Sequence, residues 1–169
     1  MLETMIRWDH TYQALRDYAE TVAELYKDNL YILDHIASGK LVSSIDWYVE
    51  MDNGRIEVDL RLEDYWRWIE YDTKPHYPPY SAILDWVKVK FKGNLPGMNG
   101  ELPSIETLER RMAYFTVKKI GEHGTTGTHG MDDAINQAYE DFSARIEEAI
   151  SLDIDESVDA IMLAAFAGD

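Results

Sequence analysis

The sequence has 169 residues, of which 32 are acidic and 16 basic, and the resulting net charge is −16. This length suits one domain with a substantial core, and the negative charge argues against binding a phosphate backbone as the main task. Cysteine is absent, the first residues lack a signal-peptide core and no apolar run spans a bilayer, so we expect a soluble cytoplasmic protein without disulfides or thiol chemistry.

Apolar residues spaced three and four apart predict an amphipathic helix over residues 11–27, with a continuation to about residue 37. They are Tyr12, Leu15, Tyr18, Ala19, Val22, Leu25 and Tyr26, followed by Leu30, Leu33, Ile36 and Ala37. Asp9 or Thr11 is the expected N-cap, and Gly39 is the expected stop.

The apolar period then changes from helical spacing to two, which predicts a β-hairpin over about residues 43–62. One face carries Ile45, Trp47, Val49 and Met51 on the first strand and Ile56, Val58, Leu60 and Leu62 on the second. Asn53 and Gly54 supply the positive φ angles of a tight primed turn.

Further helices fill the rest of the chain. Residues 63–71 predict a short helix, with a continuing strand as the alternative. Ser81 is expected to cap a helix to about residue 91, and Ser104 one to about residue 120 with Phe115 among its core residues. Residues 93–103 predict a loop, and residues 131–150 and 154–166 two acidic helices. The expected fold is α+β in a single domain, residues 1–169, with an antiparallel hairpin sheet packed by a long N-terminal helix and several further helices.

Residues 65–86 (YWRWIEYDTKPHYPPYSAILDW) combine many aromatic rings with three prolines. The prolines exclude helix and inner strand over residues 74–79, and burial of the surrounding rings predicts a connector pinned against the core. The candidate interface and structural residues here are Tyr65, Trp66, Trp68, Glu70, Thr73, Lys74, Pro75, His76, Pro78, Pro79 and Trp86.

The charge is uneven along the chain. Residues 132–169 hold eleven acidic residues and one basic, whereas residues 81–123 hold seven basic and five acidic. Such asymmetry could let neighbouring copies meet head to tail, and a solvated acidic helix face explains it equally.

Three chemical interpretations lack the spacing they need. Glycines in residues 121–134 (GEHGTTGTHGMDDA) suggest a phosphate cradle, but no phosphate-binding motif is present. A metal site from His76, His123 and His129 with Glu122 or Asp132 lacks a ligand motif. Four carboxylates could do acid–base work or bind magnesium, yet no nucleophile stands beside a base: Glu63, Asp64, Glu70 and Asp72. We therefore expect no enzyme activity, no metal and no cofactor.

Four segments together resemble the neck proteins of tailed bacteriophages, also called tail-completion or head-tail connector proteins. They are residues 36–47 (IASGKLVSSIDW), the hairpin, residues 65–79 (YWRWIEYDTKPHYPP) before AILDWVKVK, and residues 113–127 (AYFTVKKIGEHGTTG). The family pattern Glu-x-Gly-Thr-Lys/Arg-Pro-His is matched by Glu70, Thr73, Lys74, Pro75 and His76. Asp72 replaces the usual glycine, so the turn there is open to change.

This resemblance, which covers roughly residues 15–133, implies an assembly role without catalytic residues. It implies a virion protein, made in the host bacterial cytoplasm, that forms a homo-oligomeric ring at the neck. Its partners would be the portal or other connector protein and tail proteins, with DNA passing through the channel without specific binding and no membrane involved. Two alternatives stay open: a small metal-dependent hydrolase or nuclease using residues 63–76, and an acidic intracellular adaptor or inhibitor.

Overall fold

The computed structural model describes residues 7–33, 38–52, 55–91 and 104–166. The chain divides into two compact units, each assembled from segments that are distant in sequence. Unit 1 comprises Met1–Asn29, Ile45–Leu62 and Gly130–Asp169, and unit 2 comprises Leu30–Ser44 and Glu63–His129. Because the units interleave along the chain, no linker marks their boundary in the sequence. Helices dominate the fold and the sheet is a two-stranded antiparallel hairpin, as the predicted α+β class requires.

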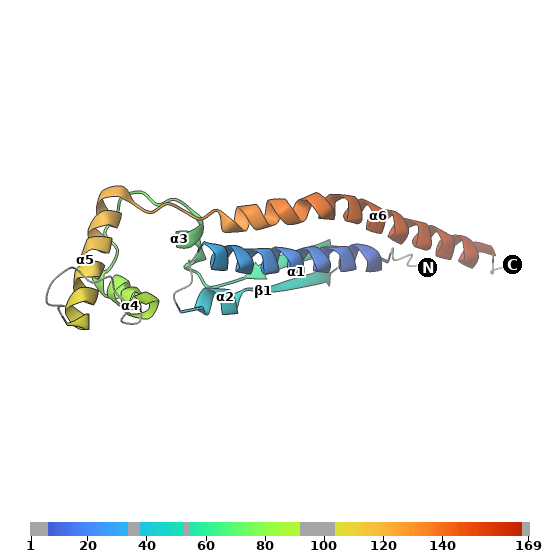
Figure 1. Cartoon of the computed structure of the whole chain (residues 1–169). Coiled ribbons are helices and arrows are strands. Elements are labelled where there is room, and N and C mark those ends of the chain that lie inside the picture. Colours follow the sequence, from blue (N-terminus) through green and yellow to red (C-terminus); the bar gives the residue numbers. More distant parts are fainter. Residues whose placement is uncertain (1–6, 34–37, 53–54, 92–103, 167–169) are drawn as a thin grey trace. The chain divides into compact units, whose positions relative to one another are not determined.

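Unit 1 is a layered arrangement in which α1 (Asp9–Ile32) lies between α6 (Gly130–Phe166) and the hairpin (Figure 1). Pairs of contacts show that α1 and α6 run in opposite directions. The amide of Asn29 donates to the carbonyl of Gly130 at 2.8 Å near one end, and the ring of Tyr18 stacks on Phe142 with centroids 4.3 Å apart. Arg145 pairs with Asp17 in the same register.

Asp153 of α6 caps the beginning of α1. Its Oδ1 accepts a hydrogen bond from the backbone N–H of His10 at 2.9 Å, and its Oδ2 accepts one from Thr11 at 2.8 Å. The first N–H groups of a helix have no partner within the helix, so this carboxylate satisfies them. The predicted cap at Asp9 or Thr11 is wrong, because α1 begins at Asp9 and takes its cap from another helix.

Small side chains form most of the buried contact surface of α1 and α6. The buried apolar residues of the two helices in unit 1 are Ala14, Ala19, Val22, Ala23, Tyr26, Met131, Ala134, Ala138 and Ala149. Alanines on both helices let the backbones approach closely, and such a contact fills its space without long side chains.

The hairpin consists of β1 (Asp46–Asp52) and β2 (Arg55–Arg61), paired antiparallel from Asp46 opposite Arg61 to Asp52 opposite Arg55. This register leaves a two-residue connection, as predicted, although residues 53–54 themselves lie outside the described residues. The face that carries Trp47 turns toward α1, since Arg16 lies over its ring at 5.5 Å and the Tyr12 hydroxyl donates to the Val49 carbonyl.

Two boundaries in the N-terminal half differ from the predicted ones. The helix α1 ends at Ile32, and residues 34–37 of its predicted continuation lie outside the described residues. Gly39 has φ of +78° and stands before a short helix, α2 (Lys40–Ser44), where the hairpin was expected to begin.

One acidic helix takes the place of the two predicted at the C-terminus. The helix α6 runs unbroken through residues 151–153. Asp153 and Ser157 are buried here, and the serine hydroxyl donates to the Asp153 carbonyl at 2.7 Å. No helix among the described residues is long and apolar enough to cross a membrane.

Unit 2 contains α2, α3 (Trp66–Glu70), α4 (Tyr80–Phe91) and α5 (Ile105–His123). Val87 of α4 and Ala113 of α5 are fully buried, and the Tyr80 hydroxyl donates to the Arg110 carbonyl. Ser104 caps α5 as predicted, because its hydroxyl accepts from the Thr107 N–H.

Two predictions for unit 2 are wrong, and a third is not tested. The predicted cap at Ser81 is wrong, because α4 begins one residue earlier and Pro79 accepts the first helical bonds. Phe115 is 61% exposed and is not a core residue. The predicted loop at residues 93–103 lies outside the described residues.

Candidate interaction site

Two segments of unit 2 that are some fifty residues apart in sequence lie side by side (Figure 1). We call residues 69–76 together with residues 120–129 the clasp. At its centre Thr73 and Thr125 form an antiparallel bridge, in which the N–H of Thr73 donates to the Thr125 carbonyl at 2.9 Å. The N–H of Thr125 donates to the Thr73 hydroxyl at 2.9 Å, and the two hydroxyls are 2.8 Å apart.

Backbone hydrogen bonds extend the clasp on both sides of this bridge. The N–H of Thr128 donates to Ile69 at 2.8 Å, that of His129 to Glu70 at 3.1 Å, and that of His76 to Ile120 at 3.3 Å. The bonds join the irregular residues 71–76 and 124–129 to each other and to the ends of α3 and α5, which fixes their path. Residues 74–79 are neither helix nor strand, as predicted, and hydrogen bonds order the beginning of this connector.

Glycines of the second segment make this close approach possible. A Cβ added at Gly124 would overlap the carbonyl oxygen of Thr73, and one at Gly127 would overlap the carbonyl of Glu70. Gly124 also has φ of +75°, a conformation that favours glycine. Gly124 and Gly127 of the glycine-rich run thus have a packing explanation, because each lies against a backbone carbonyl of the first segment.

Asp72 takes part in the clasp. Its Oδ1 accepts a hydrogen bond from the N–H of Gly127 at 2.7 Å. Because a carboxylate oxygen is a strong acceptor for a backbone N–H, this side chain adds a bond across the clasp.

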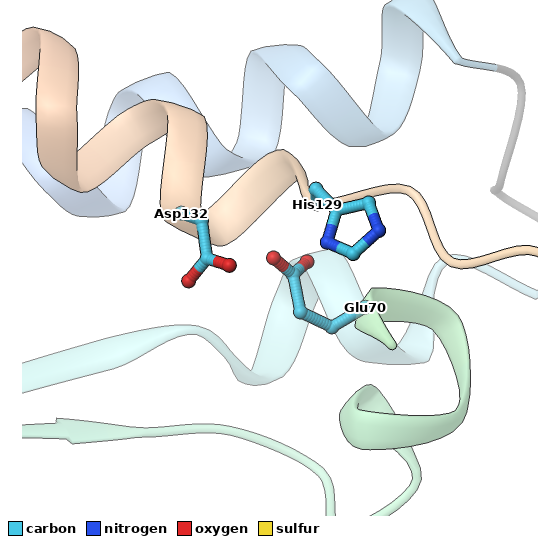
Figure 2. Close-up of side chains that lie close together, drawn as sticks. All are labelled: Glu70, His129 and Asp132. Atoms are coloured by element: carbon cyan, nitrogen blue, oxygen red, sulfur yellow. The ribbon is translucent and has the colours of Figure 1, made fainter. Parts of the chain in front are cut away.

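Glu70 and His129 are neighbours in unit 2. Figure 2 shows the carboxylate and the imidazole side by side, and the ligand atoms that they offer lie within 4.8 Å of each other. Glu70 is fully buried, and the Thr128 hydroxyl donates to its Oε2 at 3.4 Å. Asp132, the third side chain drawn, stands in the first turn of α6 and belongs to unit 1. Within the described residues of unit 2 alone, no third carboxylate or imidazole completes a ligand set with this pair.

The other two histidines of the metal hypothesis, His76 and His123, make different contacts or lie in another element. His76 places its Nδ1 2.9 Å from the Lys74 carbonyl, and its ring lies 5.7 Å from that of Trp68. His123 stands in the last turn of α5. Among the described residues His76, His123 and His129 do not meet in one ligand group.

The four predicted carboxylates do not form a paired acid–base group among the described residues. Glu70 is buried, whereas Glu63, Asp64 and Asp72 are exposed. The carboxylate of Asp72 accepts the hydrogen bond from the Gly127 N–H. Glu63 donates its backbone N–H to the Ser44 hydroxyl.

An apolar hollow of about 550 Å³ adjoins the short helix α3, and all of its lining belongs to unit 2. We call it the tryptophan hollow. Three of the predicted interface residues line it: Tyr65, Trp68 and Trp86. The other lining residues are Leu30, Ser38, Gly39, Lys40, Leu41, Val42, Ile69, Ala82, Asp85 and Val89.

Large rings around the tryptophan hollow stay accessible. Trp68 is 63% exposed and Trp86 is 41% exposed. Tyr65 is more enclosed, and burial, aided by the charge of Glu63, raises the pKa of its hydroxyl. Aromatic residues that are exposed around a hollow are typical of contact surfaces.

The remaining predicted interface residues lie along the clasp and beyond it. Trp66 is half-buried with its ring 5.9 Å from Tyr71, Thr73 is at the centre of the clasp, and Lys74 is exposed. Pro75 and Pro79 are exposed and Pro78 is half-buried.

The prediction that ring burial pins the connector to the core is wrong. Tyr77 is 72% exposed and Tyr71 is 43% exposed, so burial of these rings contributes little. Backbone bonds of the clasp hold the connector, and sequence spacing does not reveal which distant backbone groups will pair. Threonines at 73 and 125 and the neighbouring glycines were the only sequence signal for it.

Comparison with known proteins gives no relative for this chain. No family model, curated protein or solved structure matches it.

Proposed function

We propose that this chain is a structural protein of the neck of a tailed phage, forming part of a ring that joins the capsid portal to the tail. The observation that carries the proposal is the tryptophan hollow, an accessible aromatic surface held beside an ordered clasp. Exposed tryptophan rings of this kind are typical of surfaces that contact another protein.

Two of the four segments that resemble neck proteins support this role, because they bind each other in unit 2. Residues 65–79 and 113–127 supply the Thr73–Thr125 bridge and the bond from Gly127 to Asp72. Because these two segments form one structural element, we expect them to occur together in related sequences.

The chemistry of the exposed rings suits an interface. Tryptophan is enriched among the residues that carry most of the binding energy in protein contacts. The hollow also holds one basic and one acidic side chain, Lys40 and Asp85, so its charge is balanced and its attraction for a partner is mainly apolar.

The net charge of −16 supports a position around a DNA channel. A negative lumen repels the phosphate backbone, so DNA slides through without being held. The proposed partners are copies of this chain, the portal or other connector protein, and tail proteins, in the virion neck.

The test replaces Trp68 by alanine and measures self-association by sedimentation velocity, with electron microscopy for rings. We expect Trp68→Ala to weaken association by about thirtyfold or more, since a central tryptophan contributes roughly 2 kcal/mol. Because Trp68 is 63% exposed, the fold should lose little stability. Tyr31→Ala is the matched control: Tyr31 is also 63% exposed, stands in the same unit and does not line the hollow.

A native protein that stays monomeric at high concentration and binds neither portal nor tail rings would overturn the proposal. Turnover of a phosphoester that requires a metal and is lost on Glu70→Gln would favour the hydrolase alternative. Tight binding to a basic protein from the host, without ring formation, would favour the adaptor.

A further inference from the structure

The C-terminal end of α6 carries apolar side chains that no described residue covers. Asp153 and Ser157 are the last buried residues of the helix, and every residue from 158 to 166 is exposed. This end has one charged residue, Asp159, among eight apolar ones. Leu163 is 71% exposed and Phe166 is 74% exposed. A helix that is apolar on all sides is normally buried, so this end has the character of a surface that meets a partner.

A second accessible surface with the opposite charge lies on α5 in unit 2. A hollow of about 420 Å³ is lined by Thr107, Arg110, Arg111, Tyr114 and Phe115. We call it the arginine hollow. Tyr114 and Phe115 are 58% and 61% exposed, and their rings meet edge to face at 5.6 Å. Its volume lies within the range of pockets that hold ligand-sized groups.

The two surfaces match in both polarity and charge. Exposed Asp155 and Asp159 accompany the apolar end of α6, while Arg110 and Arg111 accompany the rings of the arginine hollow. Arg110 is paired with Glu106 of the same helix at 2.7 Å, so the charge that faces a partner comes mainly from Arg111. Opposite charges beside apolar groups steer and align a contact. Arg111 is exposed and Asp159 is exposed, so both are accessible to a neighbour.

We propose that the end of α6 in one copy, residues 158–166, docks in the arginine hollow of a second copy of this chain. The contact is heterologous, because different patches of the two copies meet, and repetition of such a contact builds rings or filaments. The inference rests on the proposed neck function only for the closure of a ring; the contact itself does not require it.

Three other occupants fit less well. Two α6 ends meeting each other would bring Asp155 and Asp159 against like charges, which is unfavourable. The tryptophan hollow has the balanced charges of Lys40 and Asp85 and offers the acidic end no preference. An anionic lipid surface would repel this helix end, because the exposed side chains of Asp155 and Asp159 beside it are acidic.

The experiment uses two variants of the full chain that each remove one side of the contact. The first is Leu163→Ser with Phe166→Ser, and the second is Arg111→Glu with Phe115→Ser. All four side chains are exposed, so the fold should persist, which circular dichroism and thermal unfolding check. Self-association is measured by sedimentation velocity at high protein concentration, because one helix end makes a contact of the smaller class, below roughly 1,200 Å².

We expect each variant alone to associate at least tenfold more weakly than the native chain. Mixed in equal amounts, with Trp68→Ala in both chains so that the tryptophan hollow does not contribute, the two variants retain one intact contact between them, and we expect them to form a dimer and nothing larger. Tyr139→Ser on α6 and Lys88→Glu on α4 are the matched controls, being an exposed ring outside residues 158–166 and an exposed cation that does not line the arginine hollow. Asp159→Arg combined with Arg111→Asp should recover association that either change alone reduces.

Several outcomes would overturn the inference. Variants that associate as the native chain does exclude these surfaces, even where rings form and the proposed function stands. A mixture that stays monomeric excludes a heterologous contact and points to contact within one chain or to a symmetric one. Vesicles of phosphatidylglycerol and phosphatidylcholine that bind the native chain but not the Phe166 variant, without self-association, would assign the helix end to a lipid surface. If the mixture dimerises and the protein is absent from phage necks, the contact stands and the proposed function fails.

Discussion

Units 1 and 2 are stabilised in different ways. In unit 1 two helices bury small side chains along their length, and polar contacts such as Asp153 with the start of α1 join them. In unit 2 an irregular clasp of backbone hydrogen bonds fixes the connector, and the nearby tryptophans stay exposed. A fold can thus keep apolar rings available for a partner when hydrogen bonds, rather than ring burial, order the segment that carries them.

The largest effect expected from this comparison is at Gly124. Gly124→Ala places a Cβ against the Thr73 carbonyl at φ of +75°, so the clasp must open or shift. We expect a loss of about 3 kcal/mol or more in the free energy of unfolding, measured by denaturant titration. Hydrogen exchange should show the loss of protection in unit 2 and little change in unit 1.

Gly39→Ala is the control that separates the two effects of Gly124→Ala, which are the strain of a positive φ and the overlap of the new Cβ with a neighbouring atom. Gly39 has φ of +78° but has no atom within 4 Å of an added Cβ. Its replacement should cost only the strain of the left-handed conformation, about 1 kcal/mol. Equal losses at the two positions would mean that the clasp does not stabilise unit 2.

The next effect is at the cap of α1 in unit 1. Asp153→Ala leaves the N–H groups of His10 and Thr11 without the carboxylate, and we expect a loss of about 1–3 kcal/mol by the same titration. Asp155→Ala, an exposed neighbour on α6, is the control and should change stability by less than about 0.5 kcal/mol. A larger loss for Asp155 than for Asp153 would contradict the cap.

The same carboxylate makes the stability of unit 1 depend on pH. Burial raises the pKa of Asp153, but hydrogen bonds from Thr11 and His10 outweigh it, and the net pKa is lowered. The stabilisation is therefore complete above the unfolded pKa, near 3.9, and is lost as pH falls through the lower folded value. Asp153→Asn should flatten this part of the acid unfolding curve, whereas an unchanged curve would mean that other carboxylates govern it.

Sequence periodicity predicts what depends on regular side-chain spacing. The presence of the helix now called α1, the hairpin register and the Ser104 cap follow from it, because apolar periodicity and capping by a neighbouring residue are local properties. The cap of α1 by Asp153 is not predictable in this way, since it joins residues more than 140 positions apart. The tryptophan hollow is predicted in part: Tyr65, Trp68 and Trp86 are candidate interface residues, but Leu41 and Val42 belong to the short helix α2, which lies between the predicted helix and the predicted hairpin.

The smallest effect concerns Asp72, which accepts the bond from Gly127 across the clasp. Asp72→Ala removes the acceptor of the Gly127 N–H in an exposed position, and we expect a loss of about 0.5–1.5 kcal/mol in unfolding free energy. Asp72→Asn keeps an acceptor oxygen and should recover most of that loss. Asp64→Ala, in an exposed carboxylate before α3, is the control. If Asp72→Gly is at least as stable as the native chain, the aspartate contributes nothing to the clasp. If Asp72→Asn keeps the native stability while Asp72→Ala and Asp72→Gly lose it, the side-chain bond to Gly127 stabilises the clasp.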